Sequence, residues 1–222
     1  GVQGEAMPWR ETSLAIGAIA LLFATLSRQP WWWQVIHAGF MPLIWATHQL
    51  AIDPGWFLLA TVLLLLVYRG ALTGQVPLYL SNKQTVQALA DLLAERGDSR
   101  FLDLGAGVGS TTVPLADTLP DSHFTGVENA PLTWLVGRLL SVGRPNIRWR
   151  WDDLWQAPLG DYDVVYAFLS PAPMPRLWDK VQAEMKPGSL FISNSFPVPG
   201  ATPDRIIEVD CTPPRPLYCY QR

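Results

Sequence analysis

One run near the middle of the chain constrains the fold most strongly: an apolar segment that ends in an acidic residue and leads directly into three alternating glycines. It reads Phe-Leu-Asp-Leu-Gly-Ala-Gly-Val-Gly over residues 101–109. Glycines at this spacing allow a tight turn and let a ligand approach bare main chain. The helical segment that follows from Ser110 would add unpaired N–H groups at its first turn. The pattern predicts a strand–loop–helix unit that binds a nucleotide-like ligand.

From residue 100 onward, strand-like and helical segments alternate, which is typical of an α/β fold. A preceding helix is expected to begin at a cap formed by Ser81 or Asn82 and to stop at Gly97. The expected strands are 101–104, 123–127, 147–151, 162–169, 189–193, 206–209 and 217–220, with helices at 110–118, 131–141 and 174–185. The pattern predicts seven strands, of which the last two close the sheet.

Three kinds of ligand loop are compared with the glycine run. A phosphate-binding P-loop would place a lysine after the last glycine, but Gly109 is followed by Ser110 and Thr111. A dinucleotide fingerprint would place its third glycine at Ser110. The run instead resembles the D-x-G-x-G-x-G loop of class I S-adenosylmethionine (SAM) methyltransferases. SAM has an amino acid end and no pyrophosphate, so an acceptor such as Asp103 is useful there.

Acidic residues also follow the next two expected strands. Glu128 ends the second strand, 25 residues after Asp103, and Asp153 follows the third strand. In an open parallel sheet, ligands bind beyond these strand ends. Glu128 can accept both ribose hydroxyls, with Asn129 beside it, and Asp153 can meet the adenine amino group, with Asp152 as the alternative. Three acids at successive strand ends, together with the glycine loop, predict a SAM site more specifically than any one of them.

From Val76 to the C-terminus, the chain resembles the mitochondrial lysine methyltransferases that modify the ATP synthase c-subunit and the adenine nucleotide translocase, and resembles their bacterial relatives more closely still. The segments that carry the resemblance are Val76-Pro77, Asp103–Gly109, Gly126-Val127-Glu128-Asn129 with the Trp134-Leu135 helix, Asp153-Leu154-Trp155, 168–174 and 195–199. The resemblance implies a Rossmann-like, seven-stranded class I methyltransferase fold with SAM as cofactor. It also implies a hydrophobic N-terminal anchor.

The resemblance also implies a set of cofactor-binding residues. They are Asp103, Gly105, Gly107, Glu128 and Asp153, and the predicted site also includes their neighbours Ala106, Asn129 and Leu154. One departure from the mitochondrial pattern concerns the acceptor: Leu169-Ser170-Pro171 replaces a glycine-containing turn. Methyl transfer mainly requires orientation of the reactants, so no residue is identified as a general base. Ser170, Tyr79 and Asn82 are the catalytic candidates. Trp155 and Phe168 are candidates to line the acceptor pocket, although core packing explains them equally well.

Two apolar runs dominate the N-terminal third: Ser13–Leu26 and Trp56–Tyr68. Each is shorter than the ~20 residues of a membrane-spanning helix. The first could extend through Trp31-Trp32-Trp33, which resembles an interfacial aromatic belt, and the second backwards towards Trp45. We expect a membrane-inserted helical hairpin. Two buried helices of a soluble protein or attachment at the membrane interface are the alternatives, and a signal peptide fits less well because no small-x-small cleavage site follows the first run.

The composition argues against two classes of partner, nucleic acids and metal ions. The 222 residues carry a formal net charge of −3 with 16 basic residues, which argues against a nucleic-acid partner. The three histidines are scattered, and Cys211 and Cys219 form no C-x-x-C, so no metal site is expected.

The sequence therefore predicts two parts, a hydrophobic membrane anchor at residues 1–74, with a linker near Gly70–Gly74, and a SAM-dependent methyltransferase domain at 75–222. The expected substrate is a lysine of a protein in or at the membrane. The expected location is the bacterial inner membrane, with the catalytic domain on the cytoplasmic side. A membrane lipid or quinone acceptor remains an alternative, as does a SAM-binding protein without turnover. The Ser170-Pro171-Ala172-Pro173 run bears only a faint likeness to the motif of amino-methylating DNA and glutamine enzymes.

Overall fold

The computed structural model describes residues 8–50, 52–67, 80–212 and 214–222. The chain separates into two compact units, Gly1–Thr61 and Val62–Arg222. Three expected features, the Gly70–Gly74 linker, the Val76-Pro77 segment and Tyr79, lie outside the described residues.

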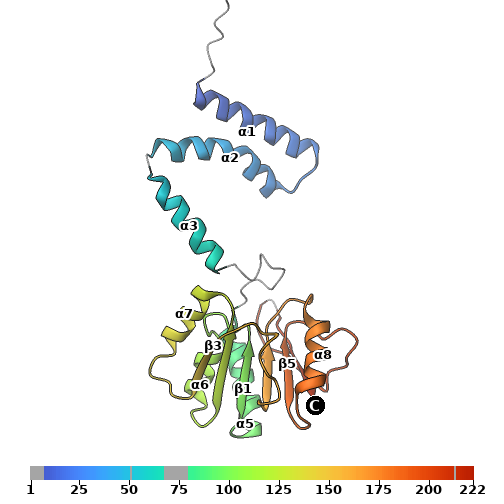
Figure 1. Ribbon diagram of the computed structural model, residues 1–222. Coiled ribbons are helices and arrows are strands. Elements are labelled where there is room, and N and C mark those ends of the chain that lie inside the picture. The colour runs from blue at the N-terminus through green and yellow to red at the C-terminus, as the bar shows by residue number, and fades with distance from the viewer. Residues whose placement is uncertain (1–7, 51, 68–79, 213) are drawn as a thin grey trace, which may run out of the picture. The chain divides into compact units, whose positions relative to one another are not determined.

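The larger unit contains one seven-stranded sheet with the strand order β3-β2-β1-β4-β5-β7-β6 (Figure 1). Its strands are β1 (Arg100–Leu104), β2 (His123–Glu128), β3 (Ile147–Trp151), β4 (Val164–Ala167), β5 (Leu190–Asn194), β6 (Arg205–Ile207) and β7 (Leu217–Gln221). Neighbouring strands among β1–β5 pair in parallel, whereas β7 is antiparallel to both β5 and β6. The expected seven-stranded sheet with two closing strands is confirmed.

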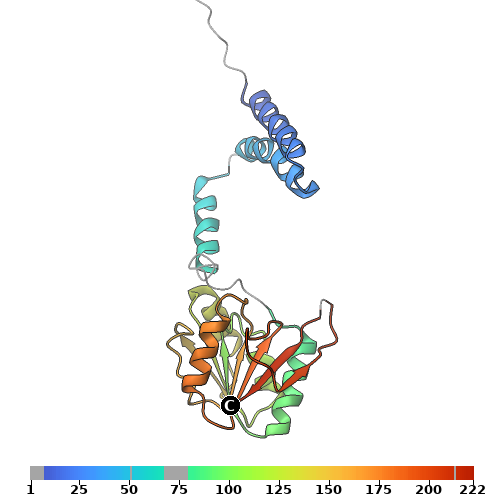
Figure 2. The ribbon, with the colours of Figure 1, turned by 90° about the vertical axis from the view of Figure 1, so that its right-hand side faces the viewer.

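Four helices of the larger unit cover the sheet: α5 (Lys83–Arg96), α6 (Thr112–Thr118), α7 (Pro131–Leu140) and α8 (Met174–Glu184). Helices α5, α6 and α7 lie on one face and α8 on the other (Figure 2). Side chains alternate along each strand, so Phe101 and Tyr166 join the core under α5 and α6, while Leu102 and Val165 join the core under α8. Both faces of the sheet are therefore buried under helices, as is usual for a parallel sheet.

The order of the strands reverses beside β1, which has β2 on one side and β4 on the other. Such a reversal opens a crevice beyond the carboxyl ends of the strands, where ligands of open α/β sheets bind. The glycine loop leaves β1 at this point, and its helix α6 begins at Thr112. The fold therefore brings the glycine run to the topological switch point of the sheet.

One predicted strand is shorter than expected. The segment 162–169 forms a strand only over Val164–Ala167. At its start, the Asp163 carboxylate accepts a hydrogen bond from the Arg100 backbone N–H (2.8 Å), and Tyr162 donates to the Leu159 carbonyl in a turn (3.2 Å). At its end, the chain turns so that the Met174 N–H meets the Pro171 carbonyl (3.2 Å). Main-chain bonds to both neighbouring strands still reach Asp163, whose N–H donates to the Arg100 carbonyl and whose carbonyl accepts from the Leu190 N–H, both at 2.9 Å. The turn at Tyr162 and the turn after Pro171 therefore limit the strand.

The smaller unit contains a helical hairpin, α1 (Trp9–Leu26) and α2 (Trp31–Gln49). The side of α1 that faces α2 carries small buried residues, Ser13, Gly17 and Ala24. A Cβ on Gly17 would press on the Ala38 carbonyl and on the Pro42 ring, so glycine allows the two backbones to approach closely. This is the packing found between helices in membranes, where small residues replace a hydrophobic driving force.

The predicted extension of the two apolar helices was wrong. The first run does not continue through the tryptophans, because α1 ends at Leu26 and Arg28 has a positive φ of 52°. Trp31 instead begins α2, and Pro30 precedes it as the N-cap residue. The second run does not extend back towards Trp45, because α3 (Pro54–Val67) starts at its own proline. A third helix, α2, therefore lies between the two predicted ones.

Of the helices in the described ranges, α1 alone is long and apolar enough to cross a membrane by length and composition, with a mean hydropathy of 1.3. A core helix or a signal sequence can pass the same test. Only 17% of the α1 window is buried, whereas a core helix is mostly buried. Helix α3 is apolar but short. Large apolar side chains are exposed along all three helices, and Trp9 and Phe23 are 81% and 71% exposed. Apolar exposure on this scale marks an interaction surface.

Candidate cofactor site

The glycine loop is held by main-chain contacts to β2. The N–H groups of Gly105 and Ala106 both donate to the Val127 carbonyl at 2.9 Å, and the Gly109 N–H donates to the Ala106 carbonyl at 2.9 Å. Gly105, Gly107 and Gly109 all have positive φ (77°, 57° and 85°), where side chains bearing a Cβ are strained. A Cβ on Gly105 would also lie 3.2 Å from Leu169 Cδ2. The loop therefore requires glycine for its course and keeps its main chain bare for a ligand.

Glu128 connects this loop to the next helix. Its Oε2 accepts a hydrogen bond from the Gly107 N–H at 2.9 Å, and its Oε1 accepts one from the Ala130 N–H, just before α7, at 2.8 Å. Each carboxylate oxygen has a further acceptor position. Glu128 can therefore keep both main-chain bonds while it accepts the two hydroxyls of a ribose. Asn129 lies next to it, and its carbonyl accepts from Trp151 Nε1 at 3.1 Å.

Asp103 lies on β1 under the glycine loop, and only 2% of it is exposed. Its Oδ2 accepts a hydrogen bond from Thr112 Oγ1, on α6, at 2.9 Å. Burial and, less strongly, the charge of Glu128 raise the pKa of Asp103 to about 7, although the Thr112 hydrogen bond acts in the opposite direction. A buried carboxyl group with such a pKa favours a cation placed beside it, such as the amino group of SAM.

The two acids after β3, Asp152 and Asp153, differ in their hydrogen bonds. Asp152 is occupied on both oxygens: Oδ2 pairs with Arg150 at 2.7 Å and Oδ1 accepts from the Asp153 N–H at 2.9 Å. Asp153 receives one bond, from the Trp155 N–H to Oδ1 at 3.1 Å. Asp153 therefore has more acceptor positions left for a ligand than Asp152. The side chain of Leu154 packs in the core under α8.

The structure brings the acids together as the sequence pattern implied, because β3, β2 and β1 are adjacent. Asp103 is the penultimate residue of β1, Glu128 is the last residue of β2, and Asp153 follows β3 by two positions. All three therefore lie at the carboxyl edge of the sheet with the glycine loop. The bare loop, the acceptor positions on Glu128 and the cation-favouring Asp103 all fit SAM.

The residues considered for the acceptor pocket do not all lie in one place. Asn82 caps α5, since its Oδ1 accepts from the Thr85 N–H at 2.8 Å. Phe168 packs in the core under α5, whereas Trp155 packs against the core under α8, where Arg176 lies 4.0 Å from its ring centroid. Ser170 is half-buried beyond the end of β4. Two residues considered for one pocket thus lie on opposite faces of the sheet.

A polar network beside the glycine loop was missed by the sequence analysis. Tyr166, on β4, is buried, and its hydroxyl contacts Ser81 Oγ at 3.0 Å and Asn194 Nδ2 at 2.8 Å. Thr111 Oγ1 donates to Ser81 Oγ at 2.8 Å, and Ser110 Oγ accepts from the Ser81 N–H at 3.1 Å. Burial and the nearby Asp103 carboxylate raise the pKa of Tyr166 above its usual value.

This network ties the segment before α5 to the loop and to the ends of β4 and β5. Arg215 adds a further tie, because its guanidinium donates to the Leu80 carbonyl at 2.9 Å. Ser195, after β5, has a positive φ of 67°, a strained conformation of the kind found at functional sites. The signal that could have revealed the network is a tyrosine within the apolar strand Val-Val-Tyr-Ala. Of the described residues, no group of three His, Cys, Asp or Glu could hold a metal ion.

Comparisons with known proteins agree with this geometry. Residues 103–205, which include the glycine loop, Glu128 and Asp153, match the ANTKMT methyltransferase domain. The adenine nucleotide translocase lysine N-methyltransferase of Mus musculus is 31% identical over 138 residues, which cover 60% of this chain and 58% of the mouse protein. The ATP synthase c-subunit lysine N-methyltransferase of Mus musculus is 29% identical over 129 residues, which cover 56% and 50%. The chain spans only about half the length of these curated relatives.

Solved structures show the same fold. An RNA methyltransferase from Salinibacter ruber, in complex with S-adenosyl-L-homocysteine, superposes with a TM-score of 0.57 at 23% identity, over 64% of this chain and 93% of that one. At this identity the likeness concerns the fold alone. The larger unit is therefore a class I SAM-dependent methyltransferase domain, similar to that of the lysine N-methyltransferases of the adenine nucleotide translocase and the ATP synthase c-subunit.

Proposed function

We propose that this protein is a membrane-anchored methyltransferase that transfers a methyl group from SAM to a lysine of a membrane-associated protein. The observation that carries the acceptor class is the match to two relatives over 138 and 129 residues, both named for N-methylation of a protein lysine. The proposed anchor is residues 1–74 and the proposed methyltransferase domain is residues 75–222.

The proposed cofactor ligands are those that surround the glycine loop. Glu128 would hold the ribose, Asp153 the adenine amino group, and Asp103 the amino group of the methionine end, with Gly105, Ala106, Gly107, Asn129 and Leu154 adjoining the cofactor. When bound, SAM supplies a methyl group on a positively charged sulfur, which carries the activation of the transfer. The task of the chain is to orient cofactor and acceptor.

A lysine acceptor has an ordinary pKa near ~10.4 and must be neutral to attack. Phe168, which is 9% exposed beyond the end of β4, offers an apolar ring that disfavours the charged ammonium group. Arg215 lies over the Phe168 ring, 5.6 Å from its centroid, and a neighbouring cation acts in the same direction. The catalytic candidates are Ser170, Tyr79 and Asn82. Asn82 also has a structural role as the cap of α5.

The membrane part of the proposal is supported by α1. Its large side chains are exposed rather than packed in a core, and the Ser13, Gly17 and Ala24 side forms a close contact with α2. By the resemblance to bacterial relatives, we propose the bacterial inner membrane as the location, with the catalytic domain on the cytoplasmic side.

The test uses purified full-length protein and radiolabelled SAM with membranes from a strain that lacks the gene, followed by separation of proteins from lipids. Label in a small hydrophobic protein, on a lysine identified by mass spectrometry, is the expected result. The control is the Glu128→Ala variant, which should label the same membranes much less than the wild type because it binds SAM more weakly. Label in the organic phase would replace lysine by a lipid or quinone acceptor. Tight SAM binding without any label would indicate a binding protein without turnover.

A further inference from the structure

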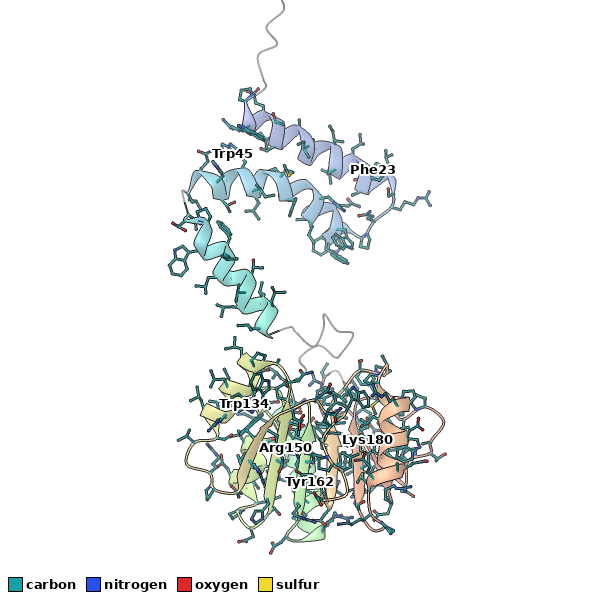
Figure 3. The ribbon with its side chains drawn as sticks, viewed as in Figure 1. Phe23, Trp45, Trp134, Arg150, Tyr162 and Lys180 are labelled. Carbon is teal, nitrogen blue, oxygen red and sulfur yellow. The ribbon has the colours of Figure 1, made fainter. Side chains whose placement is uncertain are left out.

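The outer side of α7 and the turn after it present an apolar surface to solvent. Leu135, Leu139, Leu140 and Val142 are exposed there, Leu139 by 61% and Val142 by 74%. Trp151, the last residue of β3, is 60% exposed. We call these five residues the α7 patch. Its tryptophan neighbour Trp134, on α7, lies at the outer edge of the sheet (Figure 3).

The inner side of α7 accounts for its folding and leaves the patch unexplained. Thr133 and Gly137 are buried, and a Cβ on Gly137 would clash with the indole of Trp149, so α7 sits directly on that ring. Helix α8 is ordinary by comparison, because the residues that it exposes include Arg176, Asp179 and Gln182. The patch is therefore in excess of what packing against β2 and β3 requires.

The segment that carries the patch is basic. Residues 131–151 contain four arginines and no aspartate or glutamate, in a chain whose net charge is −3. Arg144 pairs with Asp117 at 2.6 Å and Arg150 pairs with Asp152 at 2.7 Å. In the ranges that the structure describes, Arg138 and Arg148 have no carboxylate within ion-pair distance. An apolar surface next to uncompensated arginine suits an anionic membrane surface.

The aromatic residues point to the same partner. The rings of Trp134 and Trp151 lie 5.9 Å apart, and Arg138 lies over Trp134 at 5.3 Å. Tryptophan and arginine beside leucine are typical of surfaces that lie at the level of lipid headgroups. A second copy of this chain would fit less well, because a two-fold contact would set the arginines of one patch against those of the other.

We propose that the α7 patch inserts into the headgroup region of an anionic membrane, as a contact separate from α1. This docking concerns lipid contact and does not depend on methyl transfer. Glu128 and Asn129 immediately precede α7, and Trp151 donates a hydrogen bond to the Asn129 carbonyl. Docking would therefore hold the rim of the cofactor site close to the membrane surface, where a lysine of a membrane protein becomes reachable.

The test places a nitroxide label at residue 139 of the full-length protein, as Leu139→Cys in a Cys211→Ala background, since Cys219 is buried. The protein is reconstituted in nanodiscs of phosphatidylcholine with or without phosphatidylglycerol. We expect collisions with oxygen to exceed those with a water-soluble nickel complex at residue 139 in the anionic nanodiscs. A matched label at Gln182→Cys, on α8, should show the reverse. High salt should weaken the contact at residue 139.

Equal water exposure at residues 139 and 182 in anionic nanodiscs would overturn the proposal. Dipolar broadening between labels at residue 139, rising with protein-to-lipid ratio, would assign the patch to a second copy and also overturn it. A label-free measurement guards against perturbation by the nitroxide: hydrogen exchange of α7 should slow on anionic nanodiscs, and this slowing should be lost in Leu139→Glu but retained in Gln182→Glu. Neither the nitroxide collisions nor the hydrogen exchange depends on methyl transfer. A negative result for membrane docking therefore leaves the proposed reaction untouched, and the reverse also holds.

Discussion

Glu128 is the residue on which the candidate site most depends, because one carboxylate joins the glycine loop to the start of α7. A hydrogen bond to a charged group contributes about 1.5–3 kcal/mol. Glu128→Ala should therefore weaken SAM binding at least about tenfold. Isothermal titration calorimetry measures this change, with Asp121→Ala, an exposed carboxylate, as the control. An unchanged affinity in Glu128→Ala would remove Glu128 from the site.

The raised pKa of Asp103 has a consequence for pH dependence. Because burial raises this pKa to about 7, the native state keeps a proton that the unfolded chain releases at lower pH, and the fold loses stability as pH rises through that window. A cationic amino group beside Asp103 favours the carboxylate. SAM affinity should therefore fall as pH drops below about 7.

The measurement is SAM affinity between pH 6 and 8.5 in the wild type and in Asp103→Asn. The variant should bind more weakly at pH 8 and lose this part of the pH dependence, since an amide does not titrate in this range. Thr112→Val removes the hydrogen bond that lowers the Asp103 pKa, so it should move the wild-type pH dependence to higher pH. Identical slopes in the wild type and Asp103→Asn would show that another group titrates.

At the scale of elements, one indole ring joins the glycine loop, β2 and α7. A Cβ on Gly109 would lie 3.1 Å from Trp149 Cζ2, one on Gly126 would lie 3.0 Å from Cζ3, and one on Gly137 would lie 2.6 Å from Cζ2. Trp149 Nε1 donates to Ser141 Oγ at 2.7 Å, which in turn donates to the Gly137 carbonyl at 2.8 Å. Three glycines and a serine thus form the slot for this side chain.

Gly137→Ala should lower the free energy of unfolding by about 1–3 kcal/mol, because the new methyl group overpacks the slot. Alanine gains roughly 1 kcal/mol of helix propensity over glycine, which offsets only part of this cost. Denaturant unfolding measures the change. The smaller ring of Trp149→Phe should relieve the overpacking, so the double variant should be more stable than the sum of the single effects implies. Additive effects would argue against the contact.

At the scale of the whole molecule, the two units differ in what they expose. Most large apolar side chains of α1 are exposed, whereas those of β1, β4 and β5 are divided between two buried clusters. Ile19→Lys together with Leu22→Lys should abolish stable insertion, because each charge costs about 2.5–3.5 kcal/mol at the centre of a membrane helix. Carbonate extraction of membranes measures insertion of the full chain. Thr12→Lys, near the start of α1, is the control. Extraction of the double variant identical to that of the wild type would contradict an anchor at α1.

Deletion of residues 1–70 tests the same anchor more broadly, and should move the protein from the carbonate-resistant fraction to the supernatant. Fractionation at low salt tests the α7 patch in the same variant. The protein that lacks residues 1–70 should still bind anionic membranes through the patch, and high salt should release it. Truncated and full-length chains that fractionate alike under carbonate would show that the N-terminal helices are not the anchor.

Much of the fold could be predicted because its determinants are local. The glycine run, the alternation of strands and helices, and the acids that end them are periodic or positional features of the chain. The hydrophobic pattern also located α1 and α3. It missed α2 as a separate helix, because Arg28 and Pro30 interrupt a run whose apolar character continues on both sides.

The sequence by itself determined the strand–loop–helix unit, the positions of Asp103, Glu128 and Asp153 at strand ends, and the apolar character of the N-terminal helices. The tertiary structure decided what depends on contacts between residues far apart in the sequence. These are the hydrogen bonds of Tyr166 with Ser81 and Asn194, and the packing of Trp149 against Gly109, Gly126 and Gly137. The physical reason is the distance along the sequence over which each property is determined. Backbone conformation follows from neighbouring residues, whereas burial, and with it the pKa of Asp103 and the exposure of the α7 patch, depends on which elements the fold packs together.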